Sequence, residues 1–406
     1  MTTRPIGPVF DADHHLYETQ DCFTRYLPRE HRDVVRYVQV NGRTKIVIRN
    51  VLTNFIPNPT FEMVARPGST MAYYSGKNPE GKTMREMMGE PMAAIPAFRD
   101  PQARLAVLDE QGSAAALMFP TLASLMEVSF LDEPDTTMQL IRAYNRWLLD
   151  DWTFNYQDRI FATPIVNPSI VDEAIRDLEF LLDNGAKAVL LRPGPVAGSP
   201  RTRSPFLPEF DPFWARVQEA GILVTVHASD SGYNRYVNDW EGADLQYQGF
   251  RPNPFQIASM GSRPIVDTML SAICHGMLSR FPGVKLFSVE NGAAFVPQVL
   301  SLLDSTYKKI PQDFAEHPRE VFRRNIWVNP FWEDSIDDLV AMIGADRVCF
   351  GSDWPHPEGL ADPVGYIDEL GNLSDDDARR IMGGNLYELL GLPIPAAVEV
   401  TSPAAV

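Results

Sequence analysis

Short runs of apolar and β-branched residues alternate along the chain with longer amphipathic segments. The apolar runs predict eight strands, at residues 9–15, 114–119, 160–165, 188–191, 222–228, 284–290, 325–329 and 347–351. The amphipathic segments predict helices at residues 135–155, 169–184, 211–220, 264–280, 293–309, 335–343 and 363–370. This alternation is typical of repeated strand–helix units with a parallel sheet. It predicts an α/β fold and a closed (β/α)8 TIM barrel, although a doubly wound open sheet gives similar local signals.

Polar residues mark the starts of several predicted helices. Ser169 and Ser335 stand where N-caps are expected, and Asp211 precedes a proline at a first helical turn. Ser374 opens a last helix that extends to Leu390, and we expect this helix to cover the barrel from outside.

Residues 28–104 interrupt the alternation. They include a hairpin-like segment at residues 37–51 that turns at Asn41-Gly42, followed by a loop-rich run. Because this insertion follows the C-terminal end of the first strand, we expect it at the barrel mouth, where it caps the site or packs on a neighbouring subunit. A purely stabilising excursion is the alternative. Residues 1–392 are expected to form one domain, and residues 393–406 a flexible tail.

Charge and composition restrict the classes of function. Acidic residues outnumber basic ones by 53 to 36, and the resulting net charge of −17 disfavours nucleic acid and anionic membranes as partners. The sequence has neither an apolar run of membrane-spanning length nor an apolar signal stretch at its start, so we expect a cytoplasmic protein. The three cysteines are far apart, which suggests neither a disulfide framework nor a cysteine metal cluster.

Ionisable residues stand at the ends of three predicted strands. Asp13 and His15 end the first strand and share a face by its two-residue period, so both can bind one ion. His227 ends the fifth strand and Asp353 follows the eighth. Any one of these residues has an ordinary hydrogen-bonding role as its alternative. Together they point to a metal site, because the C-terminal ends of barrel strands form the face that carries active sites.

These motifs resemble the amidohydrolase superfamily, in particular the amidohydrolase-2 branch that includes aminocarboxymuconate semialdehyde, resorcylate and carboxyvanillate decarboxylases. The resemblance runs from Val9 to Leu392. Its other marks are Arg-Phe-Pro-Gly-Val-Lys at 280–285, Gly-Ser-Asp-Trp-Pro at 351–355 and Gly-Asn-Leu-Tyr at 384–387. It implies a deformed barrel and one divalent ion held by Asp13, His15, His227 and Asp353, with Asp353 also handling a proton. We expect zinc, with manganese as the alternative.

The chain departs from many of these relatives at the sixth strand. Glu290 stands where they carry a catalytic histidine. We interpret Glu290 as a general acid or base, an additional ligand, or a residue that orients His275 or His227; a structural acid behind the ligands is the alternative. The acid-x-histidine order of the first strand resembles the aromatic-acid decarboxylases more than the hydrolytic deaminases.

Several other residues are candidates for contact with a substrate. Arg192 ends the fourth strand and can bind a carboxylate in bidentate fashion, with an ion pair to Glu290 or another barrel acid as the alternative. His356 is a second candidate for a carboxylate or oxyanion. Tyr17 and Trp332 are expected to form an aromatic wall, although core packing is an alternative for the tryptophan.

Two further histidines are placed by their elements. His275, in the helix at 264–280, is expected to face the pocket as a catalytic residue, with simple space filling as the alternative. His14 points away from His15 by the strand period, so it is expected behind the ligands.

The expected function is non-oxidative decarboxylation of an aromatic or unsaturated carboxylic acid by a metal-dependent carboxy-lyase. Hydrolysis of a carbon–carbon, ester or amide bond by metal-activated water would use the same ligands and is the alternative. A non-catalytic barrel scaffold is the third hypothesis, against which the presence of all four ligand types argues. The expected partners are a small carboxylate substrate and a second copy of the chain in a homodimer.

Overall fold

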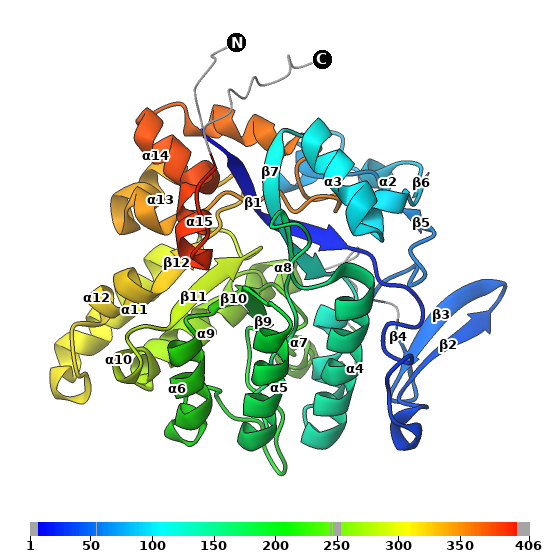
Figure 1. The fold of residues 1–406 in the computed structure, drawn as a ribbon, viewed down its shortest axis with the longest axis horizontal. Helices are drawn as coiled ribbons and strands as arrows, with labels where there is room; N and C mark the ends of the chain where they lie inside the picture. Colours follow the sequence, from blue (N-terminus) through cyan, green and yellow to red (C-terminus); the bar gives the residue numbers. More distant parts are fainter. Residues whose placement is uncertain (1–6, 54, 244–245, 247–252, 396–406) are drawn as a thin grey trace.

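Two parallel sheets lie at the centre of the computed structural model, which describes residues 7–53, 55–243, 246 and 253–395 (Figure 1). The first sheet has the order β1-β7-β8 and consists of β1 (Val9–Leu16), β7 (Ser113–Pro120) and β8 (Ile160–Ala162). The second has the order β12-β11-β10-β9 and consists of β9 (Ala188–Leu191), β10 (Leu223–His227), β11 (Lys285–Val289) and β12 (Ile326–Val328). Neighbouring strands are therefore consecutive barrel strands along the chain, as in a (β/α)8 barrel.

Isolated contacts join the two sheets on both sides. On one side, the Val166 N–H donates to Leu190 O at 2.9 Å, next to a parallel bridge between Ile165 and Leu190. On the other side, the segment that follows Arg347 lies between β12 and β1. There the Cys349 N–H donates to a β12 carbonyl at 3.0 Å, and Phe350 O accepts the Ala12 N–H of β1 at 2.9 Å. The strand order thus runs around the barrel and returns to β1.

The eighth predicted strand, residues 347–351, does not form a regular ladder. Its polar groups bond elsewhere: the Phe350 N–H donates to Ile381 O at 2.9 Å, outside the barrel. Two residues further on, the Ser352 N–H donates to the side-chain Oδ1 of Asp11 at 2.9 Å. The other seven predicted strands are present, and β8 is shorter than predicted since Pro164 has no N–H to continue the pairing.

Helices cover the outer side of the sheets (Figure 1). They are α3 (Pro101–Glu110), α4 (Pro134–Trp152), α5 (Val171–Asp183), α6 (Asp211–Ala220), α9 (Arg263–Cys274), α10 (Met277–Arg280), α11 (Phe295–Lys309), α12 (Pro318–Asn325), α13 (Ile336–Ile343), α14 (Asp375–Arg379) and α15 (Asn385–Leu390). None of the helices in the described ranges is long and apolar enough to cross a membrane.

Three predicted helices differ from the structure. The one at 264–280 divides into α9 and α10 because Gly276 takes a left-handed φ of 72°. Residues Pro363–Leu370 form a 3₁₀ helix, and the last predicted helix consists of α14, a π-helical turn at Arg380–Gly384 and α15.

Only one of the predicted side-chain caps forms. The Ser374 hydroxyl accepts the Asp377 N–H at the start of α14, whereas Ser335 makes no side-chain cap bond. Ser169 lies outside α5, whose N-cap is Ile170, and Asp211 is the first residue of α6.

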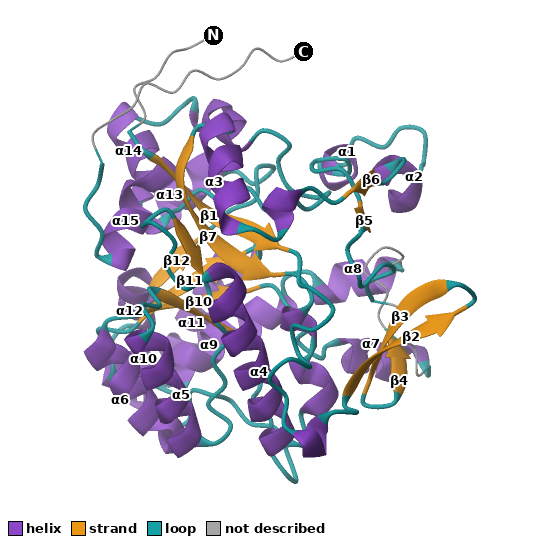
Figure 2. Cartoon of the chain, turned by 45° about the vertical axis from the view of Figure 1, so that its right-hand side comes forward, coloured by secondary structure: helices purple, strands orange, loops and turns teal. Residues whose placement is uncertain are grey.

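Two excursions leave the barrel on the same side (Figure 2). The first contains β2 (Val35–Val40), β3 (Arg43–Ile48), β4 (Val51–Thr53), β5 (Met63–Val64), α1 (Met71–Tyr74), α2 (Met84–Met88) and β6 (Met92–Ala93). Its hairpin turns at Asn41 and Gly42, with φ values of 50° and 72°, as predicted. It ends earlier than predicted, because α3 already packs on β7. The second excursion, between β10 and α9, carries α7 (Asn234–Glu241) and α8 (Pro254–Met260) and was not predicted.

Candidate active site

Four side chains from three strand ends converge on one point. They are Asp13 and His15 of β1, His227 at the end of β10, and Glu290 directly after β11. Asp13 Oδ1 lies 3.4 Å from both His15 Nε2 and His227 Nε2, and Glu290 Oε2 lies 3.1 Å from His227 Nε2. One ligand atom from each residue lies within 4.8 Å of all the others. Two imidazoles and two carboxylates in this arrangement fit one divalent ion.

The buried polar atoms at this point have no hydrogen-bond partner among the described residues. They are Asp13 Oδ1, His15 Nε2, His227 Nε2 and Asp353 Oδ1. Buried polar atoms in proteins are nearly always hydrogen-bonded, so several that face one another without a partner indicate a shared non-protein ligand. The residues present therefore fit a mononuclear metal centre.

The two imidazoles are oriented from behind. His15 Nδ1 lies 3.2 Å from Pro120 O, and His227 Nδ1 lies 2.7 Å from Ala228 O. A carbonyl oxygen only accepts, so each Nδ1 carries a proton and each Nε2 faces the cluster, where it can offer its lone pair to an ion. This is the tautomer that a metal-binding histidine requires.

Asp353 lies beside the four-residue cluster. Its Oδ1 is 3.4 Å from His15 Nε2 and 2.7 Å from His356 Nδ1. The fourth place next to Asp13, His15 and His227 is taken by Glu290, whereas Asp353 groups with His15 and His356. Its role as a ligand therefore stays a prediction.

Close packing explains why a glycine stands two residues before Asp353. A Cβ on Gly351 would lie 2.7 Å from Asp13 Cβ and 2.8 Å from Asn329 Nδ2, closer than side chains can pack. The Asp353 N–H then donates to Asp13 O at 2.8 Å. Asp353 and Glu290 both have left-handed backbones, with φ of 59° and 55°, a strained conformation that occurs preferentially at functional sites.

Electrostatics distinguishes the acids of the site. Burial opposes ionisation of Asp13, but the polar and electrostatic interactions of its carboxyl with the His15 and His227 rings outweigh it and hold the pKa of this carboxyl below its usual range. Burial, followed by repulsion from Glu290, raises the pKa of Asp353 well above its usual range. Asp13 is thus an anion suited to binding a cation, whereas Asp353 is suited to carrying a proton.

Asp11, His14 and Arg104 form a polar layer behind β1. His14 Nε2 lies 3.0 Å from Asp11 Oδ2, and the ring points away from the cluster, as its strand position predicts. Arg104 of α3 is fully buried; its Nη2 donates to His15 O at 2.8 Å and its guanidinium lies 4.6 Å from the Trp354 ring centre. Arg104 was not among the residues predicted from the sequence. The feature of the sequence that could have indicated a buried Arg104 is its position four residues before Leu108, on the same face of α3.

Three predicted site residues lie elsewhere. Arg192 is buried next to Glu127, with Nε 3.7 Å from Oε2, and also donates to Pro195 O, so its side chain is tied into its own loop. This is the ion pair with another barrel acid that was the alternative. His275 is exposed at the end of α9, where the chain turns back toward the N-terminal ends of the strands. Trp332 packs partly buried against the core.

Three residues of the cluster, His15, His227 and Glu290, line a cavity of about 1240 Å³. Tyr17 and His356, both predicted to meet a substrate, also line it, together with segments of the two excursions. Part of the insertion at 28–104 thus lines the same cavity as the cluster, and its role as a cap of the barrel mouth stays a prediction.

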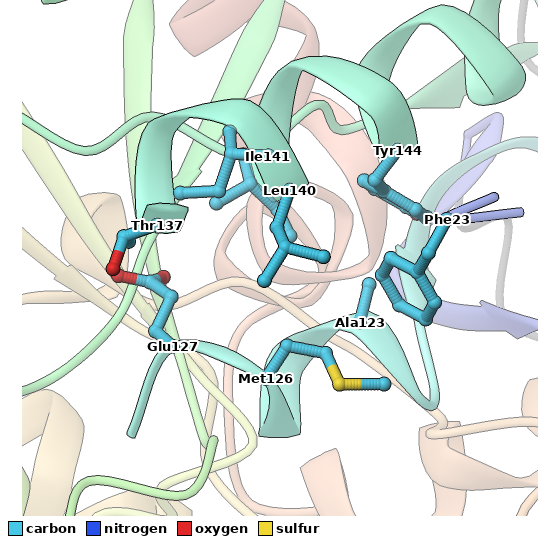
Figure 3. Close-up of a pocket in the computed structure, with 9 residues that line it drawn as sticks. Phe23, Ala123, Met126, Glu127, Thr137, Leu140, Ile141 and Tyr144 are labelled. Carbon is cyan, nitrogen blue, oxygen red and sulfur yellow. The ribbon is translucent and has the colours of Figure 1, made fainter. Parts of the chain in front are cut away.

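A second, much smaller cavity lies between α4 and the loop after β7 (Figure 3). Phe23, Met126, Leu140 and Tyr144 surround it, and it holds about 10 Å³. That is room for one water molecule at most, so this cavity is a packing gap and not a substrate site.

The sequence of this chain matches the model of a known protein family. The amidohydrolase family model matches residues 10–392, so the chain belongs to this family. An amidohydrolase from Mycobacterium avium subsp. paratuberculosis K-10 is 38% identical, with a TM-score of 0.89 over 96% of this chain and 100% of that one.

Two further proteins, one similar in sequence and one in fold, are decarboxylases by name. The Dictyostelium discoideum 2-amino-3-carboxymuconate-6-semialdehyde decarboxylase is 29% identical over 198 residues, which are 46% of this chain and 49% of that protein. The chain thus matches about half of this curated relative. A manganese-bound 5-carboxyvanillate decarboxylase from Novosphingobium aromaticivorans shares the fold, with a TM-score of 0.61 and 16% identity over 96% of this chain and 98% of that one.

Proposed function

We propose that this protein is a metal-dependent carboxy-lyase that releases carbon dioxide from an aromatic or unsaturated carboxylic acid. The observation that carries the proposal is the cluster of Asp13, His15, His227 and Glu290, three of which (His15, His227 and Glu290) line the cavity, with Asp353 directly beside the cluster. The two decarboxylases among the relatives support this choice within the family. We propose zinc as the ion, with manganese as the alternative. We also propose Asp353 Oδ1 as a further ligand of this ion.

The proposed chemistry divides between the ion and the side chains. Asp13, His15, His227 and Glu290 would hold a divalent ion, which would supply Lewis-acid chemistry toward the oxygen atoms of the substrate. Asp353 gives its proton to the ring or alkene carbon that bears the carboxyl group. The bond from that carbon to the carboxyl carbon then breaks, its electron pair restores the ring or alkene, and carbon dioxide leaves. Asp353 is left as a carboxylate and regains a proton from solvent; His356 Nδ1, at 2.7 Å, holds it in place.

Hydrolysis is the second candidate because of the position of Glu290. Its side chain is 20% exposed and lines the cavity, with Oε2 3.1 Å from His227 Nε2. A carboxylate there can take a proton from a water molecule that attacks a carbonyl carbon.

Isotope labelling decides between the two reactions. Metal-loaded protein is incubated with hydroxylated aromatic acids and ring-cleavage products in oxygen-18 water, and carbon dioxide and product mass are measured. We expect carbon dioxide without oxygen-18 in the organic product. Label in the product without carbon dioxide would refute the carboxy-lyase and favour hydrolysis.

A matched pair of variants tests the assignment of the proton donor. Asp353→Asn should lower kcat at least about a hundredfold, the usual contribution of a general acid, while circular dichroism stays unchanged. His275→Ala should keep near-normal turnover, because this side chain is exposed and distant from the cavity. Near-normal turnover of Asp353→Asn would refute the role of Asp353.

We further propose a homodimer, since enzymes with long insertions at the barrel mouth commonly use them for pairing as well as for capping. Light scattering at several protein concentrations measures the mass directly. A monomer at micromolar concentration would contradict the dimer and leave the proposed reaction unaffected.

A further inference from the structure

A wall of aromatic rings leads from the metal-binding cluster into the insertion. The His15 and His356 rings stack with centroids 3.9 Å apart, and Tyr17 lies 6.1 Å beyond His356. Phe61 then stacks on Tyr17 at 4.7 Å, with an angle of 14° between the ring planes. These side chains all line the large cavity. Because the rings stack on one another and are largely buried, they present their edges to the cavity and together form an apolar aromatic wall that continues beyond the place of the reaction.

The backbone around Phe61 is built to place this ring. Phe61 has a left-handed φ of 48°, which is unfavourable for a bulky side chain and persists only where the surroundings fix it. Two hydrogen bonds fix it: the Phe61 N–H donates to Asn58 O at 3.1 Å, and Asn58 Nδ2 donates to Met63 O at 2.8 Å. These surroundings leave only 4% of Phe61 exposed.

Other parts of the cavity lining are apolar as well. The insertion contributes Met84 and Met88 of α2, and the second excursion contributes Ile257 and Met260 of α8. Methionines adapt their shape to flat apolar ligands. The cavity holds about 1240 Å³. A cavity of roughly 150 Å³ is enough for a benzene ring, so this one takes far more than a single-ring acid.

The charges of the described lining residues are one-sided. Arg85 is the only lysine or arginine among them, whereas five acids line the cavity; Glu290 and Glu358 group with the metal-binding residues, and Glu86, Glu90 and Asp230 are the other three. A second anionic group on a substrate, placed away from the metal-binding cluster, would meet mainly carboxylates and be repelled.

From the aromatic wall, the volume of the cavity and the charges of its lining residues, we propose that the substrate is a carboxylic acid with an extended, uncharged aromatic body of two or more fused rings. Its single carboxyl group lies at the cluster, and its body lies along Tyr17 and Phe61 between the two excursions. This proposal rests on the carboxy-lyase function proposed above and specifies its substrate class.

Binding to the wild-type, metal-loaded protein tests the proposal without any turnover. Calorimetry measures Kd for hydroxybenzoic, hydroxynaphthoic and three-ring hydroxyarene carboxylic acids, and for each acid with a second carboxylate on its far ring. We expect Kd to fall about tenfold for each added ring, from the apolar area buried. We also expect the second carboxylate to weaken binding at least tenfold. Equal or weaker binding of the larger acids would overturn the proposal, as would tighter binding of the dicarboxylates.

A matched pair of phenylalanine variants locates the effect. In the wild type we expect three-ring acids to bind more tightly than one-ring acids. Phe61→Leu should reduce this gain in affinity at least fivefold. Phe314→Leu, which removes an aromatic ring far from the cavity, should keep the wild-type gain. An undiminished gain in Phe61→Leu would remove this ring from the recognition surface and overturn the proposed placement.

The outcomes separate this proposal from the reaction on which it rests. If affinity rises with ring number but no acid releases carbon dioxide, the carboxy-lyase function fails and the recognition surface stands. If carbon dioxide is released while single-ring acids bind most tightly, the function stands and the substrate class proposed here is wrong.

Discussion

Glu18 shows at the residue scale how the loop around the site is held. Its Oε1 accepts the Leu122 N–H at 2.8 Å and the Ala123 N–H at 2.9 Å, whereas Oε2 has no hydrogen-bond partner in the described structure. Burial raises the pKa of this carboxyl to about 7, against the two backbone hydrogen bonds. The adjacent Thr121 hydroxyl bonds Leu16 O and contacts His356 Nε2 at 3.0 Å, so Glu18 supports the loop that orients His356.

The raised pKa predicts a pH-dependent stability. Between the unfolded value of 4.5 and the folded value of about 7, the folded chain keeps a proton that the unfolded chain releases. Stability from Glu18 is therefore complete below pH 4.5 and is lost as pH rises to about 7, by up to roughly 3 kcal/mol at 1.36 kcal/mol per unit. Glu18→Gln keeps an acceptor but cannot ionise, so its unfolding free energy should fall less across this range.

Urea unfolding at several pH values measures the difference. The exposed Glu110→Gln serves as the control and should follow the wild-type pH profile. Parallel profiles for wild type and Glu18→Gln would show that this carboxyl is not the group responsible.

At the scale of elements, the contact between β1 and the segment after Phe350 positions the first ligand. Gly351 allows this approach, since any Cβ there would collide with Asp13 Cβ. We predict that Gly351→Ala shifts Asp13, costs about 1–3 kcal/mol of stability by overpacking and weakens metal binding at least tenfold. Metal competition with a chromogenic chelator measures the affinity.

Gly365→Ala is the matched control for that variant. A Cβ at this position meets no atom closer than 3.5 Å, an ordinary contact. Its metal affinity should equal that of the wild type, and an equal affinity for Gly351→Ala would mean that the contact does not position Asp13.

The elements also show where sequence reasoning succeeds. Seven strands were predicted because a buried strand is a local run of apolar residues, and the candidate metal-binding residues Asp13, His15 and His227 were found at the ends of two of these runs. The prediction of a strand at 347–351 was wrong. The N–H groups of Phe350 and Ser352 donate to Ile381 O and to the Asp11 side chain, which are distant in sequence and which no local pattern indicates. The loop around Arg192 likewise folds its guanidinium onto Glu127, which no local pattern indicates. The family resemblance, in contrast, is confirmed by the match over residues 10–392.

For the whole molecule, metal binding and folding are linked. The four residues of the cluster come from β1, β10 and the end of β11, so an ion that they shared would connect parts of the barrel that separate on unfolding. At a metal concentration of about 100 times Kd, we predict a gain of roughly 2.7 kcal/mol in unfolding free energy over chelator-treated protein. Thermal unfolding with and without zinc or manganese measures it.

Two histidine variants show whether that gain comes from the cluster. His227→Ala should lose most of it, whereas His275→Ala, with its exposed side chain, should keep it. The same gain in both variants would assign the stabilising metal to another place on the protein.

The two excursions around the cavity have a consequence for how this enzyme diversifies. Each leaves the barrel directly after a ligand-bearing strand, β1 or β10, and returns to it before the next helix of the barrel. Insertions, deletions and exchanges in these segments can therefore reshape the chamber while the ligand geometry stays fixed by the strands. Descendants of one ancestral barrel can acquire new substrates through these two segments alone, and their lengths should vary most among relatives that act on different acids.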